Sequence, residues 1–582
     1  MGTLKYYVGS ELPIEWTAQH GCDNPNLKCD IILQYMCESP SSMLGGVRDG
    51  TTTNTIPQNQ NQCRDGNCDV DYRFGRHETF KSYQYCQTRE RNKGLFQASQ
   101  QIAANRNSAI YTRQNPTGNR YGYECTEERD YYPYWHPSEW KDIAVITDSA
   151  ERCAYYQANS QNVVDKGTCV NNVTGAFLSH NNPAACLAAR ISLNGRPWAQ
   201  GQWVPSGNWK LPPPVCQTPE RSRDNHLGNV MGGHTAHFNW TIPNDVNSRC
   251  TLRMRYNITT GDYDGWNTFS DKNDANGRRV GVKGTSTPNF NSTTSPSSYP
   301  LANNPIVDFG VGIKLQLAVN TAQFSRTFQD RSHVFEIAMR PSCVNPLTKI
   351  KNLNVRGKRG NIVQTYPSTE YDFTPDRLEI DSNTLVHVQW TGSNTNPNNN
   401  DGQGKEGTDR HNLIQLLDND LSRSYPMSVQ SSSLVADPFF AYLLSLTEPG
   451  HLGGNTRELD DAGTYFNAGL VPAPLPGRHN YMCTRNNNFS NRGQKSSINV
   501  TPVPFVVALV SISQGGQLFL RPNKVSTATS APLSTHVFVD FSAGVVSTNV
   551  PVCLICCFFT CLAHPSTRVI CIAPLLLTSF AG

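Results

Sequence analysis

The sequence has few charged side chains and no strong excess of either sign. Lys, Arg, Asp and Glu make up 16% of the residues, below the share of about 25% that is usual for soluble proteins. The formal net charge is +4, spread along the chain, so nucleic acid is not an expected partner. Helical periodicity is rare, whereas short alternating runs recur between Gly, Pro and Asn-rich turns. These runs predict an all-β protein.

Several signatures of catalysis are missing as well. No nucleophile elbow, phosphate-binding loop or Ser/His/Asp arrangement stands out in the chain. The glycines of "GVGIKLQL" precede no helix, so they do not form a nucleotide-binding fingerprint. The sequence therefore favours a protein that is not an enzyme, has no catalytic residues and holds no cofactor.

Long apolar segments are absent. The opening run "MGTLKYYVGSELPIEW" lacks the apolar core of a signal peptide, and we expect that the start is truncated. The first apolar run of the tail, "VPVCLICCFFTCLA", is shorter than the about 20 residues that span a bilayer. We interpret residues 503–582 as either a lipid-anchor signal or a gene-model artefact. Membrane contact is expected only if the anchor signal is genuine.

Cysteines, in contrast, are numerous. Of the 19 cysteines, fourteen lie between Cys22 and Cys483, and five crowd into Cys553–Cys571. Fourteen is an even number, and no CxxC pair is matched by a second one, as a zinc site would require. The pattern predicts disulfides formed in an oxidising compartment, outside the cell or on its surface. The connectivity stays open, because fourteen cysteines allow many pairings.

N-glycosylation sequons support a secreted glycoprotein. In "TAHFNWTI" and "CTLRMRYNIT", strand alternation places Asn239 and Asn257 opposite the apolar residues, so we expect both to face solvent. Six sequons occur, at Asn172, Asn239, Asn257, Asn291, Asn488 and Asn499.

The chain divides into four parts. Residues 1–345 are expected to form a cysteine-rich β-sandwich region, which two packed units could make up. Residues 346–364 read as a basic connector, 365–502 as a second β domain, and 503–582 as the tail. In "NTLVHVQWTG", alternation directs Val386, Val388 and Trp390 inward and His387 outward.

The connector contains a candidate site for a processing protease, formed by Arg356, Lys358 and Arg359. The alternative is a solvated β-turn, in which Gly357 and Gly360 supply the bend.

The stretch "TEERDYYPYWHPSEW" combines carboxylates with aromatic rings. Residues 127–140 could therefore form a carbohydrate-active or carbohydrate-binding face. A packed aromatic cluster with acids at the surface is the other interpretation.

Long runs of the chain resemble the DD-three-three family of secreted proteins. They cover most of residues 6–500, and the resemblance implies an extracellular protein with no assigned activity and a cupredoxin-like C-terminal portion. Family members normally begin with a signal peptide and a further segment before the "YYVGS" run. The runs are "YYVGSELPIEWTAQHGC", "RERNKGLF", "ECTEERDYYPYWHPSEWKDIAVITDSA", "NTAQFSRTFQDRSHVFEI", "NLNVRGKRGNIVQTYP", "HVQWTGSNTNPNNNDGQGKEGTDRHN" and "YMCTRNNNFSNRGQK".

A cupredoxin-like domain raises the question of copper. A blue-copper site needs two imidazoles and one thiolate, and His411 in "DRHN" and Cys483 in "YMCTR" are the candidate ligands. The run after Cys483, "TRNNNFSNRGQK", has neither His nor Met. His479 lies four residues before Cys483, about 13 Å away on a strand. The alternatives are a Cys483 disulfide, with Cys343 as a candidate partner, and a strand-end hydrogen bond of His411 within "TDRHN".

Taken together, these patterns predict β-sandwich units, with a disulfide-rich N-terminal region followed by a cupredoxin-like Greek-key sandwich. The predicted protein is an extracellular or cell-surface glycoprotein with a structural or binding role. Its expected partner is a carbohydrate or a cell-surface protein. The alternatives are a copper protein that uses His411 and Cys483 and a carbohydrate-binding or carbohydrate-active protein that uses residues 127–140.

Overall fold

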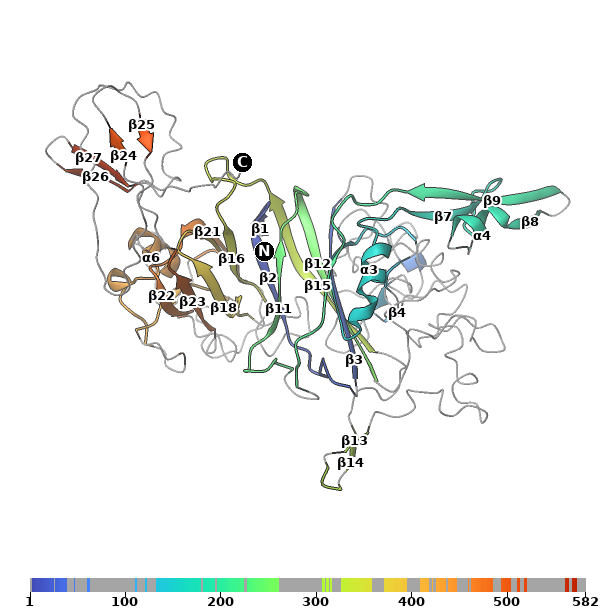
Figure 1. Cartoon of the computed structure of the whole chain (residues 1–582), viewed down its shortest axis with the longest axis horizontal. Helices are drawn as coiled ribbons and strands as arrows, with labels where there is room; N and C mark the ends of the chain where they lie inside the picture. The colour runs from blue at the N-terminus through green and yellow to red at the C-terminus, as the bar shows by residue number, and fades with distance from the viewer. Residues whose placement is uncertain are drawn as a thin grey trace.

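Three β-sheets dominate the part of the chain that the computed structural model describes, and they lie as successive layers (Figure 1). The described residues are 3–25, 27–38, 47, 60–62, 110–111, 121–122, 132–134, 136–178, 180, 182–193, 196–223, 228–260, 306–308, 310–312, 314–316, 326–357, 371–394, 409–417, 421, 425–435, 438–446, 459, 462–484, 494–503, 510–512, 518–520, 560–564 and 568–572.

We call the layers the N-terminal, middle and C-terminal sheets, and give the strands of each in spatial order. The N-terminal sheet contains β1 (Leu4–Tyr7), β15 (Arg326–Ala338), β12 (Asn247–Thr260), β3 (Leu27–Cys37), β6 (Lys141–Thr147) and β10 (Val215–Gln217). The middle sheet contains β11 (Ala236–Thr241), β2 (Glu11–Trp16), β16 (Ile350–Val355), β19 (Leu385–Thr391) and β21 (Tyr465–Pro472), with β17 (Phe373–Thr374) paired to β16. The C-terminal sheet contains β18 (Arg377–Asp381), β23 (Lys495–Thr501), β22 (Gly477–Met482) and β20 (Ile414–Gln415).

Smaller elements lie around these layers. An arm of β7 (Lys166–Asn171), β9 (Arg196–Ser206) and β8 (Arg190–Leu193) extends away from the body (Figure 1). Two-stranded pairs are formed by β4 (Ile110–Tyr111) with β5 (Tyr121–Gly122), β13 (Ile306–Asp308) with β14 (Lys314–Gln316), β24 (Val510–Ile512) with β25 (Leu518–Leu520) and β26 (Thr560–His564) with β27 (Arg568–Ile572). The described helices are η1 (Gln60–Gln62), η4 (Ala150–Arg152), α3 (Cys153–Asn159), α4 (Pro183–Ala188), η8 (Val429–Ser431) and α6 (Pro438–Ser445).

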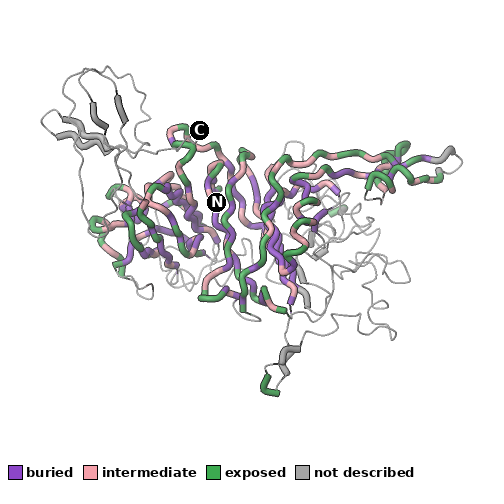
Figure 2. Tube along the Cα trace, viewed as in Figure 1, coloured by how far each residue is buried: buried purple, intermediate pink, exposed green. Residues whose placement is uncertain are grey.

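The middle sheet packs against both of its neighbours. On one face Leu12, Ile14 and Trp16 of β2 join the apolar core of the N-terminal sheet. On the other face Val388 and Trp390 of β19 belong to a second core, which they share with the C-terminal sheet. Buried residues consequently run through all three layers (Figure 2). The all-β sandwich architecture predicted from the alternating runs is confirmed.

The segment expected to be a connector is a strand of this middle sheet. β16 lies inside residues 346–364, and it pairs in parallel with β19 and, at Lys351 and Glu11, with β2. Its burial is almost continuous because both of its faces are covered. The prediction of a connector is therefore wrong for residues 350–355, which join the two halves of the chain into one sheet.

Polar side chains fill the seam where β1 meets the middle sheet. The Gln389 amide pairs with Lys5 as a neighbouring strand would: Lys5 N–H donates to Oε1 at 2.9 Å, and Nε2 donates to Lys5 O at 2.6 Å. His387 is fully buried under the ring of Tyr7, with ring centroids 4.9 Å apart. The His387 side chain points away from the core of its own domain, as predicted, but it meets Tyr7 of β1 instead of solvent. The exposure expected for His387 is therefore wrong.

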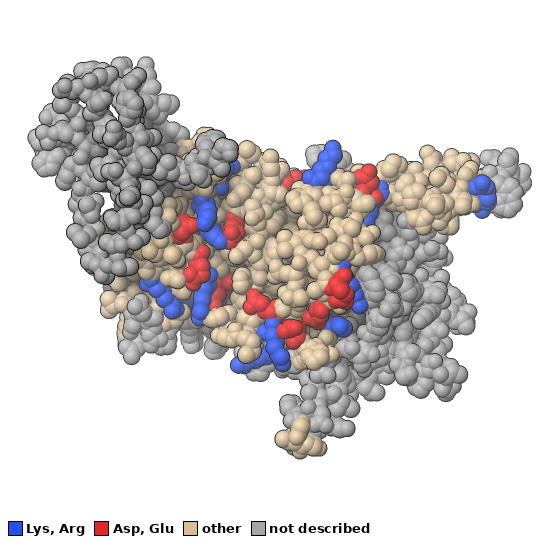
Figure 3. Space-filling model, in the orientation of Figure 1, with Lys and Arg blue, Asp and Glu red and all other residues tan. Residues whose placement is uncertain are grey.

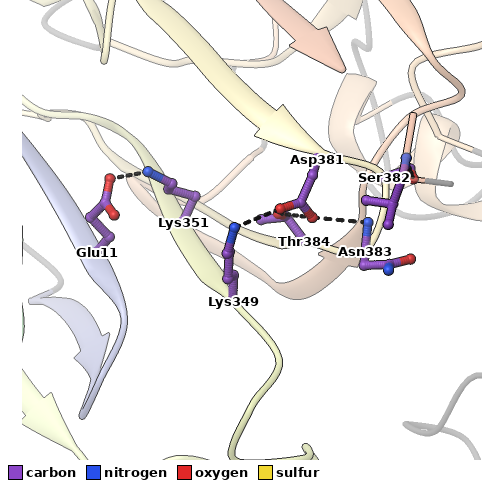
Figure 4. Close-up of polar contacts among 8 residues, drawn as sticks. Glu11, Lys349, Lys351, Asp381, Ser382, Asn383 and Thr384 are labelled. Carbon is purple, nitrogen blue, oxygen red and sulfur yellow. Dashed lines mark hydrogen bonds and ion pairs between the residues drawn. The ribbon is translucent and has the colours of Figure 1, made fainter. Parts of the chain in front are cut away.

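Ion pairs lie within the middle sheet and between the middle sheet and the C-terminal sheet (Figure 4). Lys351 of β16 pairs with Glu11 of β2. Lys349 contacts Asp381 at 2.7 Å, and Asp381 accepts a hydrogen bond from the Thr384 hydroxyl at 3.0 Å. These charges remain partly exposed, so each pair adds little stability and mainly sets register.

A buried polar network covers the other face of the N-terminal sheet. Arg253 of β12 is 1% exposed, and its Nη2 donates to Gln34 Oε1 at 2.6 Å and to Tyr134 Oη at 2.9 Å. Gln34 Nε2 in turn donates to Asp142 Oδ1 at 2.7 Å. The Arg253 guanidinium also lies 3.8 Å from the ring centroid of Trp140. This layer explains why charged residues alternate along β12 without reaching solvent.

Disulfides occur in the N-terminal region, as the cysteine count predicts. The described residues form Cys22–Cys29, Cys37–Cys250, Cys153–Cys216 and Cys169–Cys186. Among the same residues, no helix has the length and apolar character needed to cross a membrane.

We expect Arg253→Met to lower the free energy of unfolding by about 3 kcal/mol, because Gln34 and Tyr134 would lose a charged donor in a buried site. Urea denaturation measures this change. The exposed Arg223 provides the control, since Arg223→Met should change stability by about 0.5 kcal/mol at most. Equal effects of the two substitutions would contradict the role of the network.

We also predict that Glu15→Gln stabilises the protein relative to wild type and that this stabilisation grows with pH. The Glu15 carboxylate accepts the Asp376 N–H at 3.0 Å, and burial raises its pKa to about 7. In the unfolded chain the pKa of a Glu carboxyl is about 4.3. Between about pH 4.3 and pH 7 the folded state therefore binds more protons than the unfolded state, and the stability of the wild type falls as the pH rises through this interval.

Relative to wild type, Glu15→Gln should gain about 3 kcal/mol between pH 4 and pH 8, since one pKa unit corresponds to about 1.4 kcal/mol. Chemical denaturation at the two pH values tests this expectation, with Glu151→Gln at an exposed carboxyl as the matched control. A pH-independent difference for Glu15→Gln would rule out the assignment.

Candidate metal centre

The two predicted copper ligands lie at one end of the C-terminal sheet. Asn412 holds Thr484 with two hydrogen bonds, in which Nδ2 donates to Oγ1 at 2.8 Å and Oδ1 accepts the Thr484 N–H at 2.8 Å. His411 precedes Asn412 and Cys483 precedes Thr484, so the sheet brings these two candidates to the same end. The structure therefore supports the predicted proximity of His411 and Cys483.

A third residue, Gln494, joins them from the position directly before β23. Cys483 N–H donates to Gln494 O at 3.1 Å, which extends the antiparallel pairing of β22 with β23 by one step. Opposed residues of such a pair point to the same face. The Gln494 side chain reaches His411, with Oε1 at 3.2 Å from Nδ1.

The cluster is sealed from solvent. His411, Cys483 and Gln494 are each 1% exposed. Cys483 lies in the core between the middle and C-terminal sheets, and the ring of Tyr371 lies 4.5 Å from that of His411. Any ion held here would lie in an apolar environment without direct access from water.

The donor set does not fit a blue-copper centre. The amide oxygen of Gln494 only accepts, so this contact requires a proton on His411 Nδ1 and leaves the lone pair of the neutral imidazole on Nε2. The opposite end of the Gln494 amide, Nε2, is buried without a hydrogen-bond partner in the described part of the chain, and an NH₂ group cannot ligate a cation. No second imidazole follows Cys483 before Gln494 in the sequence.

His479 does not complete the set. It lies within β22, which is extended as predicted, and its ring nitrogens contact Leu475 O at 2.7 Å and Ser433 Oγ at 3.2 Å. Within the described residues no group of three His, Cys, Asp or Glu side chains is placed to hold a metal ion.

The alternatives predicted for the two residues fare differently. His411 forms a hydrogen bond to Gln494, which lies outside the "TDRHN" segment in which its partner was predicted. The four described disulfides include neither Cys483 nor Cys343, so the predicted bond between these two cysteines is not formed.

Gln494 was missed in the sequence because a mostly polar run, "TRNNNFSNRG", separates it from Cys483. The register of β22 with β23 brings it back beside Cys483, and register is a tertiary property. The signal that could have found it is the return of alternation at "QKSSINV" after the loop.

The aromatic side chains of residues 127–140 that the structure describes form no exposed platform, and Tyr131 and Trp135 lie outside the described residues. Tyr132, Tyr134 and Trp140 are buried, at 0%, 5% and 1% exposure. Their rings pack against the outer face of the N-terminal sheet and against Arg253. The interpretation as a sugar-binding face built on these rings is wrong, and the packed cluster is confirmed. Glu127, Glu128 and Asp130 lie outside the described residues.

The sequon asparagines separate into exposed and buried positions. Asn172, Asn239 and Asn499 are exposed, and β11 alternates as predicted around Asn239. Asn257 is 1% exposed, so its predicted solvent exposure is wrong. It lies on the predicted face of β12, but a further layer covers that face. Asn291 and Asn488 lie outside the described residues.

Arg356 of the candidate processing site is held against the N-terminal sheet. Its Nη1 donates to Val334 O and its Nη2 to Ser332 O, both at 2.7 Å. The predicted solvated turn is therefore wrong for this side chain, and a protease would have to displace it from β15. Lys358 and Arg359 lie outside the described residues.

The layered sheets and the position of His411 and Cys483 define a two-part β protein whose second part is cupredoxin-like. The model of the DD3-3 N-terminal domain matches residues 1–337, and that of the DD3-3 cupredoxin-like domain matches residues 348–500. The chain belongs to the DD3-3 family, as the resemblance predicted.

Solved structures with similarity to the chain include an auracyanin and a plastocyanin. Auracyanin B is 19% identical, covering 28% of this chain and 94% of its own, with a TM-score of 0.15. The oxidised form of plastocyanin from Dryopteris crassirhizoma is 15% identical, covering 26% of this chain and 99% of its own, with a TM-score of 0.13. No curated protein matches the chain.

The exposure of each sequon asparagine predicts which of them carry a glycan. After expression of the full chain in a eukaryotic secretory host, we expect glycans at Asn172, Asn239 and Asn499 and an unmodified Asn257. Glycosidase release in heavy-oxygen water followed by peptide mass spectrometry reports occupancy at each site. Asn239 is the matched control for Asn257, since both lie in strands of the same region. A glycan on Asn257 in folded protein would contradict the covered face of β12.

Proposed function

We propose that this chain is an extracellular or cell-surface glycoprotein with a structural or binding role. The disulfides carry this proposal, because bonds such as Cys37–Cys250 and Cys153–Cys216 persist only in an oxidising compartment. The exposed sequons at Asn172, Asn239 and Asn499 support it. A rigid body in which both halves share one sheet suits a scaffold better than a protein with moving parts.

In this proposal the cupredoxin-like domain is a packing unit. His411 Nδ1 forms a hydrogen bond with Gln494, and the Cys483 side chain packs in the apolar core. The domain then transfers no electrons, and its place in the molecule is to complete the middle sheet.

The proposed partner is a carbohydrate or a cell-surface protein. Lys and Arg are interspersed with Asp and Glu on the visible face (Figure 3), which supports a partner other than a polyanion such as nucleic acid. Glycan-array binding by the secreted full chain, with heat-denatured protein as the control, separates a carbohydrate partner from a protein partner.

A second candidate function is copper binding through Cys483 and His411. It is favoured by the meeting of these residues at one end of the C-terminal sheet, although His411 Nδ1 is hydrogen-bonded to Gln494. Copper would then supply a redox centre, with Cys483 as the thiolate and His411 as one imidazole.

Metal loading distinguishes the two functions. After incubation with copper, we expect the secreted full chain to hold well below 0.1 equivalents of the metal and to show no thiolate-to-copper absorption band. We also expect an unchanged melting temperature. A ligand that binds the folded state at one hundred times its Kd would add about 2.7 kcal/mol of stability and raise the melting temperature. Stoichiometric copper with a visible band that is lost in Cys483→Ser would overturn the packing role. His479→Gln is the control, since this imidazole is held elsewhere.

A further inference from the structure

One disulfide of the N-terminal sheet joins two strands that already pair with each other. Cys37 of β3 and Cys250 of β12 lie directly opposite in the antiparallel register. The other described disulfides join segments that are not paired in this way: Cys153–Cys216 links α3 to β10, and Cys169–Cys186 links β7 to α4.

A direct cross-strand position is a poor fit for a disulfide. Opposed residues of an antiparallel pair hold their Cβ atoms about 4.5–5.5 Å apart, whereas a disulfide needs about 3.5–4.5 Å. The Cα atoms of Cys37 and Cys250 are accordingly drawn to 3.9 Å, inside the usual lower limit of about 4.4 Å. The corresponding distance is 5.6 Å for Cys153–Cys216.

The strands do not need this bond for their pairing. Backbone registry of β3 with β12 continues from Cys37 and Cys250 to the far end at Leu27 and Thr260. The bond lies at the end of this ladder, where Glu38 N–H still donates to Arg249 O at 2.8 Å. A register shift on the β15 side, between Asn247 and Cys250, marks the same place.

The two sulfurs differ in access. Cys37 is half-buried, whereas Cys250 is fully buried. A reductant therefore reaches the bond from the Cys37 side, and Cys250 is the leaving group.

We propose that Cys37–Cys250 is a redox modification site, which a dithiol reductant reduces selectively while the other described disulfides stay oxidised. The reductant class is a vicinal dithiol, of the kind carried by extracellular thiol–disulfide oxidoreductases.

The reaction balances as two thiol–disulfide exchanges. A thiolate of the dithiol attacks Cys37 Sγ, forms a mixed disulfide and releases Cys250 as a thiolate, which takes up a proton. The second thiol of the reductant loses its proton and attacks its own partner sulfur in the mixed disulfide, which releases Cys37 as a thiolate that is protonated in turn. Two electrons and two protons pass to the cysteines, and the dithiol becomes a disulfide.

Reduction should open the ladder only at its end. Reduction lets the Cα atoms of Cys37 and Cys250 move apart, which favours the two thiols over the disulfide. The hydrogen bond from Glu38 N–H to Arg249 O is then the first to loosen. Ile32, in the middle of β3, stays paired with Arg255.

Equilibrium titration of the full chain in dithiothreitol redox buffers tests the site. Differential alkylation and mass spectrometry read each disulfide, and Cys153–Cys216 is the matched control because both of its cysteines are half-buried. We expect the equilibrium constant for reduction of Cys37–Cys250 to be at least about tenfold larger, a difference of about 30 mV. Equal or later reduction of Cys37–Cys250 would overturn the proposal.

A second measurement keeps the proposal testable if the reduced protein loses stability. Hydrogen exchange of the Glu38 amide should rise at least about tenfold on selective reduction, and in the double variant C37S/C250S, while the Ile32 amide is unchanged. Loss of protection throughout β3 would show that the bond is structural. Unchanged exchange at Glu38 would show that reduction has no local consequence.

Discussion

The pairing of β2 with β16 is the contact on which the rest of the molecule depends. β2 comes from the first family domain and β16 from the second, and their union makes one sheet with an apolar core on each face. Neither half of the chain completes this sheet alone. The buried amide of Gln389, which pairs with Lys5 as a strand would, shows how the seam satisfies backbone groups that no strand covers.

This arrangement favours a packing role for the cupredoxin-like domain. A domain buried along one sheet is fixed in orientation, and its core must be dense because it supports a neighbour. The two residues predicted as copper ligands lie here at an imidazole–amide contact beside the buried Cys483 side chain. Such a contact engages His411 Nδ1 without an ion, which is the physical reason for proposing a packing role for the domain.

The N-terminal half is stabilised by different means. It carries the described disulfides, and a buried layer containing Asp142 and Arg253 closes the outer face of its sheet. Most of these covalent links tie loops and helices to strands. Cys37–Cys250 differs because it links strands that already pair, so its loss leaves the topology intact, and the proposed redox site follows from that redundancy.

Alternation along the chain determined which residues share a face, because the period of a strand is local and needs no partner. It placed Asn239 and Val388 correctly, and the cysteine count predicted the disulfides of the N-terminal region. Whether a polar face meets water was decided only by the tertiary structure. Asn257 and His387 face away from one core as predicted, yet another layer covers them. Gln494 joined His411 through strand register, which depends on pairing between segments that a loop separates.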